Sequence, residues 1–180
     1  YPKFLQKIIC YVEDNVQLTC LYGMTENLLV CVIDGREKAT YTVEGDIVGK
    51  PLKDVSIRIV DDEIELSSPQ LFLGYFSLSK SNIYHRTGDL GKLNNDGNII
   101  LLGRKKDMII RRNTNIYPGL YEPTIAKIKG VDEVAMVGLY DEKIQDEKVI
   151  LVIDGSISKN KLITELKYGK YNIDNEAFPD

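Results

Sequence analysis

Residues 103–118 read GRKKDMIIRRNTNIYP, and this stretch separates two halves of the chain that have different sequence patterns. Its five cations surround a short apolar run and a single acid, and they are Arg104, Lys105, Lys106, Arg111 and Arg112. A charge run of this kind can bind phosphate, can be the solvated end of a strand, or can belong to an active site. The sequence on either side has to decide among these interpretations.

The overall composition is that of an ordinary folded protein with an acidic balance. The 180 residues carry a net charge of −4 and a sequence pI near 5.2. Hydrophobic residues make up 43% and charged residues 28%, which suits one or two globular domains. Because nucleic-acid binding needs a concentrated positive field, we expect no nucleic-acid partner.

The cysteines and the single histidine form no recognisable motif. Cys10, Cys20 and Cys31 lack CxxC or Cys/His spacing, which is typical of unreactive thiols in a reducing compartment. His85 alone gives little support for a histidine-based metal site or a Ser-His-Asp triad. No run is long and apolar enough to cross a bilayer. We therefore predict a cytoplasmic location and no transmembrane segment.

The residues before position 45 predict the end of an α/β subdomain. Residues 4–9 have the apolar spacing of a helix, and residues 16–22 alternate like a strand that ends at Tyr22 and Gly23. The run LLVCVI at 28–33 is rich in β-branched residues. We interpret 1–44 as this α/β remnant.

Residues 45–103 have a different pattern, with short alternating runs broken by Gly, Pro and Asp. DDE at 61–63 and NNDGN at 94–98 are typical hairpin turns. These features predict a small antiparallel β-barrel-like subdomain.

The half that follows residue 103 predicts a small α+β domain over 107–180. The expected elements are a strand at 108–110, a helix from Pro118 to about Lys129, core strands in VDEVAMVGLY (131–140) and EKVILVID (147–154), and a helix at 158–168. The predicted fold class for the whole chain is therefore mixed α+β.

The stretch LYGMTEN, residues 21–27, places a hydroxyl and a carboxylate after the predicted strand. Ligands bind at the carboxyl ends of strands in open α/β sheets. Glu26 is suited to hold Mg²⁺, which prefers oxygen ligands, and Thr25 can donate to a phosphate oxygen. A plain polar loop explains the same residues, so this motif leaves both interpretations open.

Two further motifs have the same ambiguity when each is taken alone. In YHRTGDLG, residues 84–91, Asp89 can accept hydrogen bonds from two adjacent sugar hydroxyls, or it can form an Asx turn. In GRKKD, residues 103–107, Arg104 can pair with phosphate through its planar guanidinium, or it can be a solvated strand end.

Taken in order, YGMTE, YxRTGDLG and GRKKDMI resemble the adenylate-forming (AMP-binding) superfamily. This superfamily contains acyl- and aryl-CoA synthetases, adenylation domains of peptide synthetases, and firefly luciferase. VGKPL, EIELSSP followed by LGY, NIYPxxYE and VDEVAMVGLYDE are similar to the same family. The resemblance covers nearly the whole chain and identifies it as a C-terminal fragment.

The resemblance implies an ATP-dependent ligase of the kind that serves fatty acid metabolism. A carboxylate and ATP form an acyl-adenylate and pyrophosphate, and the acyl group then passes to a thiol such as CoA or the pantetheine of an acyl-carrier protein. The implied cofactors are ATP or AMP and Mg²⁺. The implied roles are Tyr22 beside the adenine, Gly23 in the nucleotide-binding turn, Thr25 near the α-phosphate, Glu26 on Mg²⁺, Asp89 on the ribose hydroxyls and Arg104 on the ribose and phosphate side.

The resemblance also implies a division into two domains. Residues 1–103 would end the large AMP-binding domain, and 107–180 would be a mobile C-terminal lid. The hinge would lie near 104–107, with Lys106 at the hinge position.

Two features depart from the family pattern. Asn113 stands where the family has Gly, in the loop that approaches the thiol acceptor, and Asn tolerates a left-handed backbone better than most residues. The family's Gly/Ser/Thr-rich phosphate loop and its lysine-bearing PxTxxGK segment are not found in these residues. We therefore expect the chain by itself to be inactive. The alternative is a non-catalytic module that docks a carrier or other partner, with Arg111 and Arg112 facing an acidic or phosphorylated surface.

Overall fold

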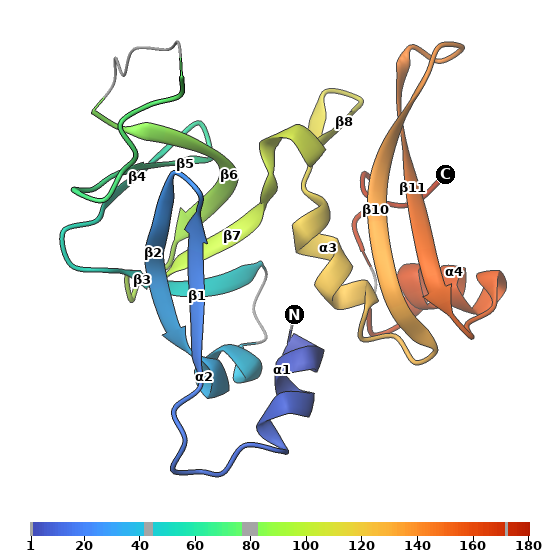
Figure 1. The fold of residues 1–180 in the computed structure, drawn as a ribbon. Helices are drawn as coiled ribbons and strands as arrows, with labels where there is room; N and C mark the ends of the chain where they lie inside the picture. The colour runs from blue at the N-terminus through green and yellow to red at the C-terminus, as the bar shows by residue number, and fades with distance from the viewer. Residues whose placement is uncertain (1, 42–44, 77–82, 172) are drawn as a thin grey trace. The chain divides into compact units, whose positions relative to one another are not determined.

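The computed structural model describes residues 2–41, 45–76, 83–171 and 173–180. The chain forms two compact units, Tyr1–Leu101 and Leu102–Asp180 (Figure 1). None of the helices in the described ranges has the length and apolar composition that crossing a bilayer requires.

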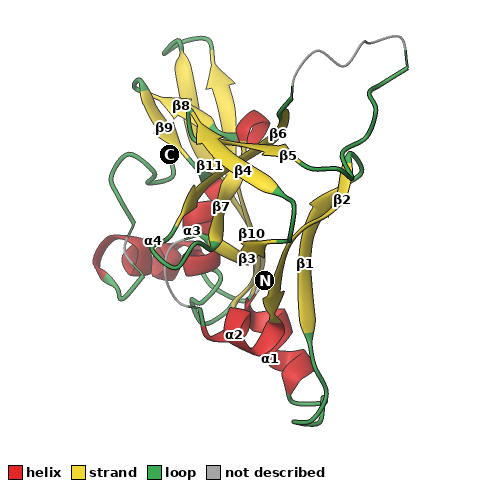
Figure 2. Ribbon diagram, turned by 90° about the vertical axis from the view of Figure 1, so that its left-hand side faces the viewer, coloured by secondary structure: helices red, strands yellow, loops and turns green. Residues whose placement is uncertain are grey.

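The first unit is dominated by antiparallel strands. Its elements are α1 (Pro2–Ile9), β1 (Thr19–Met24), β2 (Asn27–Asp34), α2 (Gly35–Thr40), β3 (Asp46–Pro51), β4 (Ser56–Val60), β5 (Glu63–Ser67), β6 (His85–Leu93) and β7 (Ile99–Arg104), of which β7 continues into the second unit. Within the described residues the strands form one sheet in the order β1-β2-β3-β7-β6-β5-β4. The helices α1 and α2 lie side by side near the start of β1 (Figures 1 and 2).

The core of the first unit is built mainly from strand residues, with Ile64 and Leu66 alternating as the period-two pattern predicts and Val30 and Cys31 buried at consecutive positions. The buried cluster contains Tyr22, Val30, Cys31, Val48, Ile64, Leu66, Leu71 and Ile99. Fully burying one aliphatic side chain of this size contributes about 1.5–3 kcal/mol. The predicted turns are confirmed, because β4 ends at Val60 before the Asp61–Asp62 turn and β6 ends at Leu93 before 94–98.

The predicted break at 44/45 does not divide the sheet. Cys31 faces Pro51 and Val32 faces Lys50 in an antiparallel pairing of β2 with β3. Strand β2 needs partners for its backbone groups on both sides, and β3 supplies them on the side away from β1. Residues on both sides of position 45 therefore share one sheet.

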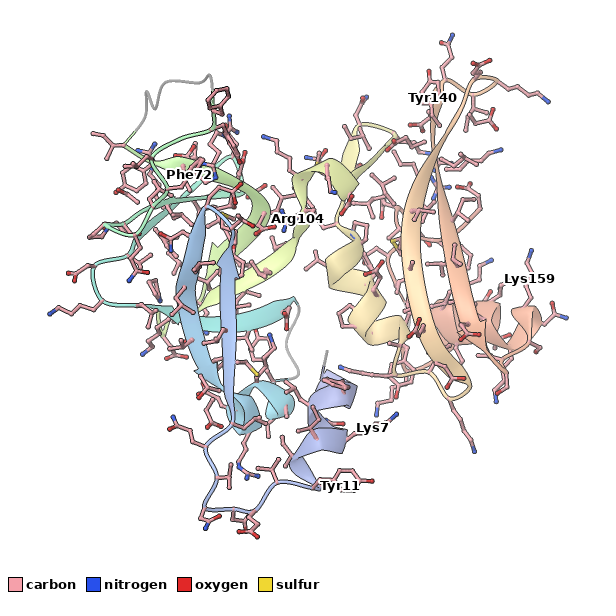
Figure 3. The ribbon with its side chains drawn as sticks, in the orientation of Figure 1. Lys7, Tyr11, Phe72, Arg104, Tyr140 and Lys159 are labelled. Atoms are coloured by element: carbon pink, nitrogen blue, oxygen red, sulfur yellow. The ribbon has the colours of Figure 1, made fainter. Side chains whose placement is uncertain are left out.

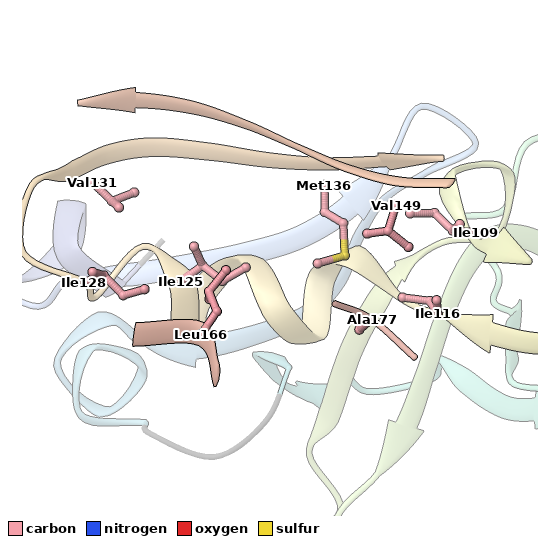
Figure 4. Packing of buried hydrophobic residues seen from close by; sticks show 9 residues of the cluster. All are labelled: Ile109, Ile116, Ile125, Ile128, Val131, Met136, Val149, Leu166 and Ala177. Atoms are coloured by element: carbon pink, nitrogen blue, oxygen red, sulfur yellow. The ribbon is translucent and has the colours of Figure 1, made fainter. Parts of the chain in front are cut away.

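The second unit is a small α+β domain. Its elements are η1 (Lys105–Asp107), β8 (Ile109–Arg111), β9 (Thr114–Ile116), α3 (Pro118–Ile125), β10 (Val131–Asp141), β11 (Asp146–Gly155) and α4 (Lys159–Tyr168). Strand β10 pairs antiparallel with β11, and β8 pairs with β9. Figure 4 shows the buried cluster, which consists of Ile109, Ile116, Ile125, Ile128, Val131, Met136, Val149, Leu166 and Ala177.

The predicted mixed α+β class is confirmed, since antiparallel sheets dominate and helices are few. The helix that the pattern extends to about Lys129 ends at Ile125 instead. Turns follow it, in which Lys127 donates to the Thr124 carbonyl and Ile128 to the Ile125 carbonyl. Ile128 is nevertheless buried, because the turns still point it into the same core.

Candidate nucleotide-binding site

Asp89 lies in a β-bulge of β6. Across the pairing with β5, Glu63 faces Leu90 and Glu65 faces Arg86, so a two-residue step on β5 matches a four-residue step on β6. The intervening residues of β6 are displaced from the regular ladder. A bulge of this kind changes the direction of a side chain, and bulges are common beside functional sites.

Side chains serve as partners for the amides of the bulge. The Asp89 amide donates to Oγ1 of Thr87 at 3.0 Å, and this hydroxyl donates to the Ile64 carbonyl at 2.8 Å. The Gly88 amide donates to Oε1 of Glu63 at 3.2 Å. Gly88 has a φ of +73°, a left-handed conformation that glycine adopts without steric cost.

The bulge brings Asp89 to the hydroxyl of Tyr22, which donates to Oδ2 of Asp89 at 2.6 Å. Both side chains are buried, with 9% and 5% of their surfaces exposed. Burial raises the pKa of the Tyr22 hydroxyl, and its hydrogen bond to the Asp89 carboxylate raises that pKa further. The pair therefore holds a neutral phenol against a carboxylate in a nearly dry site.

This contact also shows that the sheet curls. Strands β1 and β6 are separated by three other strands in the sheet order. In a flat sheet they would lie about 19 Å apart, far beyond the reach of one side chain. Tyr22 on β1 can contact Asp89 on β6 only because the sheet bends around the core, as in a barrel.

Thr25 and Glu26 connect β1 directly to β2. The strand that was predicted to end at Tyr22 and Gly23 continues to Met24, and β1 and β2 form a hairpin. The prediction of a strand end of the open α/β type is wrong here, because the chain turns back at once to pair with itself. The two polar residues lie at a hairpin tip.

The hairpin tip is attached to the segment that follows β5. The Phe72 amide donates to the Glu26 carbonyl at 2.8 Å (Phe72 is labelled in Figure 3). The Tyr75 hydroxyl donates to Oε1 of Glu26. This hydrogen bond raises the pKa of Tyr75. The Ser68 hydroxyl donates to the side-chain oxygen of Asn27. These contacts fix where the Glu26 carboxylate lies.

Arg104, Lys106 and Asn113 lie in the second unit. Arg104 ends β7, Lys106 lies in η1, and all three side chains are exposed. Asn113 has a φ of +62° and Arg112 a φ of +51°, so both residues of the β8–β9 turn are left-handed. The roles proposed for these three residues stay predictions.

Arg111 has a structural role that the sequence left open. Its guanidinium donates to the Phe178 carbonyl at 2.6 Å and to the Glu176 carbonyl at 3.1 Å, and it pairs with Asp180 at 2.7 Å. Asp180 in turn accepts from the Val149 amide at 2.9 Å. Arg111 therefore attaches residues 176–180 to β8, and Asp180 attaches them to β11.

Cys31 faces Tyr22 across the hairpin, and burial raises the pKa of its thiol to about 12. From its ordinary value of 9.0 up to about 12, the unfolded chain loses this proton while the folded chain keeps it. Stability therefore falls as the pH rises through this window, by at most about 1.4 kcal/mol per pH unit. We expect Cys31→Val to lose less stability than the wild type between pH 8 and 11.

Urea unfolding followed by circular dichroism in the presence of a reducing agent measures this difference. The raised pKa of Tyr22 acts in the same direction above pH 10 and is present in both proteins. The small part of that rise caused by Cys31 is lost in Cys31→Val, which adds to the expected difference. An equal loss of stability in the two proteins would contradict the prediction.

Sequence comparison finds CoA ligases. The chain is 36% identical over 163 residues to the 2-succinylbenzoate–CoA ligase of Lactococcus lactis, covering 83% of this chain and 34% of that protein. It is 31% identical over 175 residues to the same enzyme of Listeria monocytogenes, covering 92% and 37%. The chain thus spans about a third of the length of these relatives. No family model matches it.

Structure comparison leads to the same group of proteins. ATP-bound MatB from Rhodopseudomonas palustris superposes with a TM-score of 0.75 at 26% identity, over 90% of this chain and 35% of that one. The o-succinylbenzoate CoA synthetase MenE from Bacillus subtilis, in complex with the acyl-adenylate intermediate OSB-AMP, has a TM-score of 0.75 at 26% identity, over 99% and 39%. Together with the ordered motifs, these likenesses show that the chain belongs to the adenylate-forming superfamily of ligases and matches its C-terminal region.

Proposed function

We propose that this chain supplies the ribose-binding part of the nucleotide site, together with the C-terminal lid, of an ATP-dependent ligase. The reaction joins a carboxylate to AMP with release of pyrophosphate and then passes the acyl group to a thiol such as CoA. One observation carries the proposal: the buried Tyr22–Asp89 pair, which the bulge of β6 holds in place. The names of the relatives make 2-succinylbenzoate the first carboxylate to test.

In this proposal Asp89 accepts hydrogen bonds from the two ribose hydroxyls. A carboxylate is an acceptor with about four lone-pair directions, so it can accept from Tyr22 and from a sugar together. Tyr22 orients the carboxylate, and its ring forms part of the wall of the adenine pocket. Gly23 keeps the backbone of β1 close to β2 beside them.

Thr25 and Glu26 act at the phosphate end of the same site. Among the described residues, no group of three or more His, Cys, Asp or Glu side chains is placed to hold a metal ion. A single carboxylate still suits Mg²⁺, since this ion usually keeps waters and takes most other ligands from substrate phosphates. Glu26 would therefore hold the ion jointly with ATP, and the ion would neutralise phosphate charge.

The second unit is proposed to be the mobile lid over 107–180. Residues 104–107 are the proposed hinge, with Lys106 at its centre, and Arg104 is the residue proposed to act on the ribose and phosphate side. Asn113 lies in the loop that approaches CoA or pantetheine. Its left-handed backbone, a conformation that Gly and Asn adopt more readily than other residues, supports this placement.

Calorimetric titration with AMP and with 2′,3′-dideoxy-AMP tests this proposal. We expect AMP to bind more tightly by tenfold or more, because hydrogen bonds to a charged acceptor contribute about 1.5–3 kcal/mol each. Equal affinities, or no binding of AMP, would contradict the ribose role of Asp89. The inactivity of this chain by itself stays a separate prediction, and ATP-dependent pyrophosphate release with 2-succinylbenzoate would contradict it.

A further inference from the structure

The β-bulge that carries Asp89 depends on two side chains from outside the proposed nucleotide contacts. In a regular ladder, β5 would offer backbone carbonyls to the amides of β6. Here the Asp89 amide donates to the Thr87 hydroxyl and the Gly88 amide to the Glu63 carboxylate. Thr87 and Glu63 are themselves buried, with 7% and 3% of their surfaces exposed. Water is therefore a poor substitute for either partner.

The Thr87 hydroxyl makes one hydrogen bond as a donor and one as an acceptor, and the two partners lie on different strands. It donates to the Ile64 carbonyl on β5 at 2.8 Å and accepts from the Asp89 amide on β6 at 3.0 Å. A valine would fill the same volume and make neither bond. A serine would keep the hydroxyl and lose only a methyl group.

Glu63 is itself held in one orientation. Its Oε2 accepts from Nε of Arg86 at 3.0 Å and also from Nη2 of the same guanidinium, while Oε1 accepts from the Gly88 amide. Both guanidinium nitrogens donate to the same oxygen, which leaves Oε1 to accept from the Gly88 amide. Glu63 on β5 is therefore hydrogen-bonded both to Arg86, before the bulge, and to Gly88, within it.

The geometry points to Thr87 and Glu63 as positioning residues that fix the bulge of β6, and with it the Asp89 carboxylate, for the ribose of the nucleotide. This inference rests on the proposed function, in which Asp89 contacts the ribose. Neither residue needs to contact the nucleotide. Their effect on binding passes through the backbone of Gly88 and Asp89 and, for Thr87, also through the Tyr22 hydroxyl that its side chain contacts.

The test compares Thr87→Val, Thr87→Ser and Thr40→Val with the wild-type chain. Thr40 is a matched control, because it is exposed at the end of α2 and its hydroxyl also donates to a backbone carbonyl, that of Glu37 at 2.8 Å. Two quantities are measured: the hydrogen-exchange rates of the Gly88 and Asp89 amides by NMR, and the affinities for AMP and 2′,3′-dideoxy-AMP by calorimetry.

We expect Thr87→Val to speed exchange of the Asp89 amide at least tenfold and to lower AMP affinity about tenfold. Affinity for 2′,3′-dideoxy-AMP should change little, so that the preference for the ribose hydroxyls is lost. Thr87→Ser should restore both readouts, and Thr40→Val should leave both at the wild-type level. Glu63→Gln keeps an acceptor for Gly88 but loses the charge that faces Arg86, so it should give an intermediate effect.

Unchanged exchange of the Asp89 amide in Thr87→Val would overturn the inference. An equal loss of affinity for the two nucleotides would also overturn it, because that result would indicate a general loss of structure. If the wild type binds no AMP, the ribose role of Asp89 fails, and the exchange rates still decide whether Thr87 fixes the bulge.

Discussion

Replacing Asp89 with alanine is expected to weaken AMP binding about 100-fold. The substitution removes the acceptor proposed for both ribose hydroxyls, and each hydrogen bond to a charged group contributes about 1.5–3 kcal/mol. Calorimetric titration of the two proteins measures the ratio of the dissociation constants. Asp96→Ala is the matched control, because it removes the same charge from an exposed turn of the same unit. It should bind AMP like the wild type.

The same substitution has a second, separable effect on stability. It leaves the buried Tyr22 hydroxyl without its acceptor at Oδ2 of Asp89, which costs about 1–3 kcal/mol. Adding Tyr22→Phe removes that hydroxyl, so the double variant should recover stability and still bind AMP poorly. If AMP affinity returned together with stability, the loss in Asp89→Ala would be a folding effect. If Asp89→Ala bound AMP like the wild type, the ribose role would be wrong.

Gly23→Ala is expected to destabilise the first unit by about 3 kcal/mol, at the upper end of the usual cost of overpacking. A Cβ at this position would overlap the carbonyl oxygen of Leu28 and would lie 2.6 Å from its carbonyl carbon. Both atoms are backbone, so no side-chain rotation can relieve the contact. Strands β1 and β2 would have to separate next to the hairpin tip that carries Thr25 and Glu26.

The measurement for Gly23→Ala is hydrogen exchange of β2 amides at increasing urea concentration, which reports on the first unit separately. Gly97→Ala is the control, since among the described residues nothing lies within 4 Å of an added Cβ there. Its φ of +79° still adds about 1–2 kcal/mol of backbone strain. The contact argument would be wrong if Gly23→Ala were no more destabilising than Gly97→Ala.

Sequence patterns predicted most of the helices, strands and turns, because turn conformation and apolar spacing depend on residues that are close together in the chain. The Asp61–Asp62 turn adopts left-handed angles that Asp tolerates, and the alternation of apolar residues sets which face of each strand is buried. The end of the helix after Pro118 was misjudged by about one turn. Apolar spacing continued to Ile128 there, and spacing alone does not distinguish a helix from turns that point residues into the same core.

The candidate site was predicted unevenly for a similar reason. Motif order singled out Tyr22, Glu26 and Asp89, but it did not show that Tyr22 donates to Asp89 or that Tyr75 donates to Glu26. Thr87 lies inside the YHRTGDLG motif, so its position beside Asp89 was the signal that could have identified it. Glu63 carried no such signal, because its partner Gly88 is 25 residues away in sequence.

By itself the sequence determined the family and the mixed α+β class, and it predicted the residues of the candidate nucleotide site. These properties depend on motifs and on periodicity along the chain. The tertiary structure alone decided that β1 and β2 join the sheet of β3, that this sheet curls until Tyr22 meets Asp89, and that β6 bulges to present the carboxylate. The physical reason is that these features come from pairing between distant strands, in which backbone and buried polar groups find partners wherever the folded chain places them.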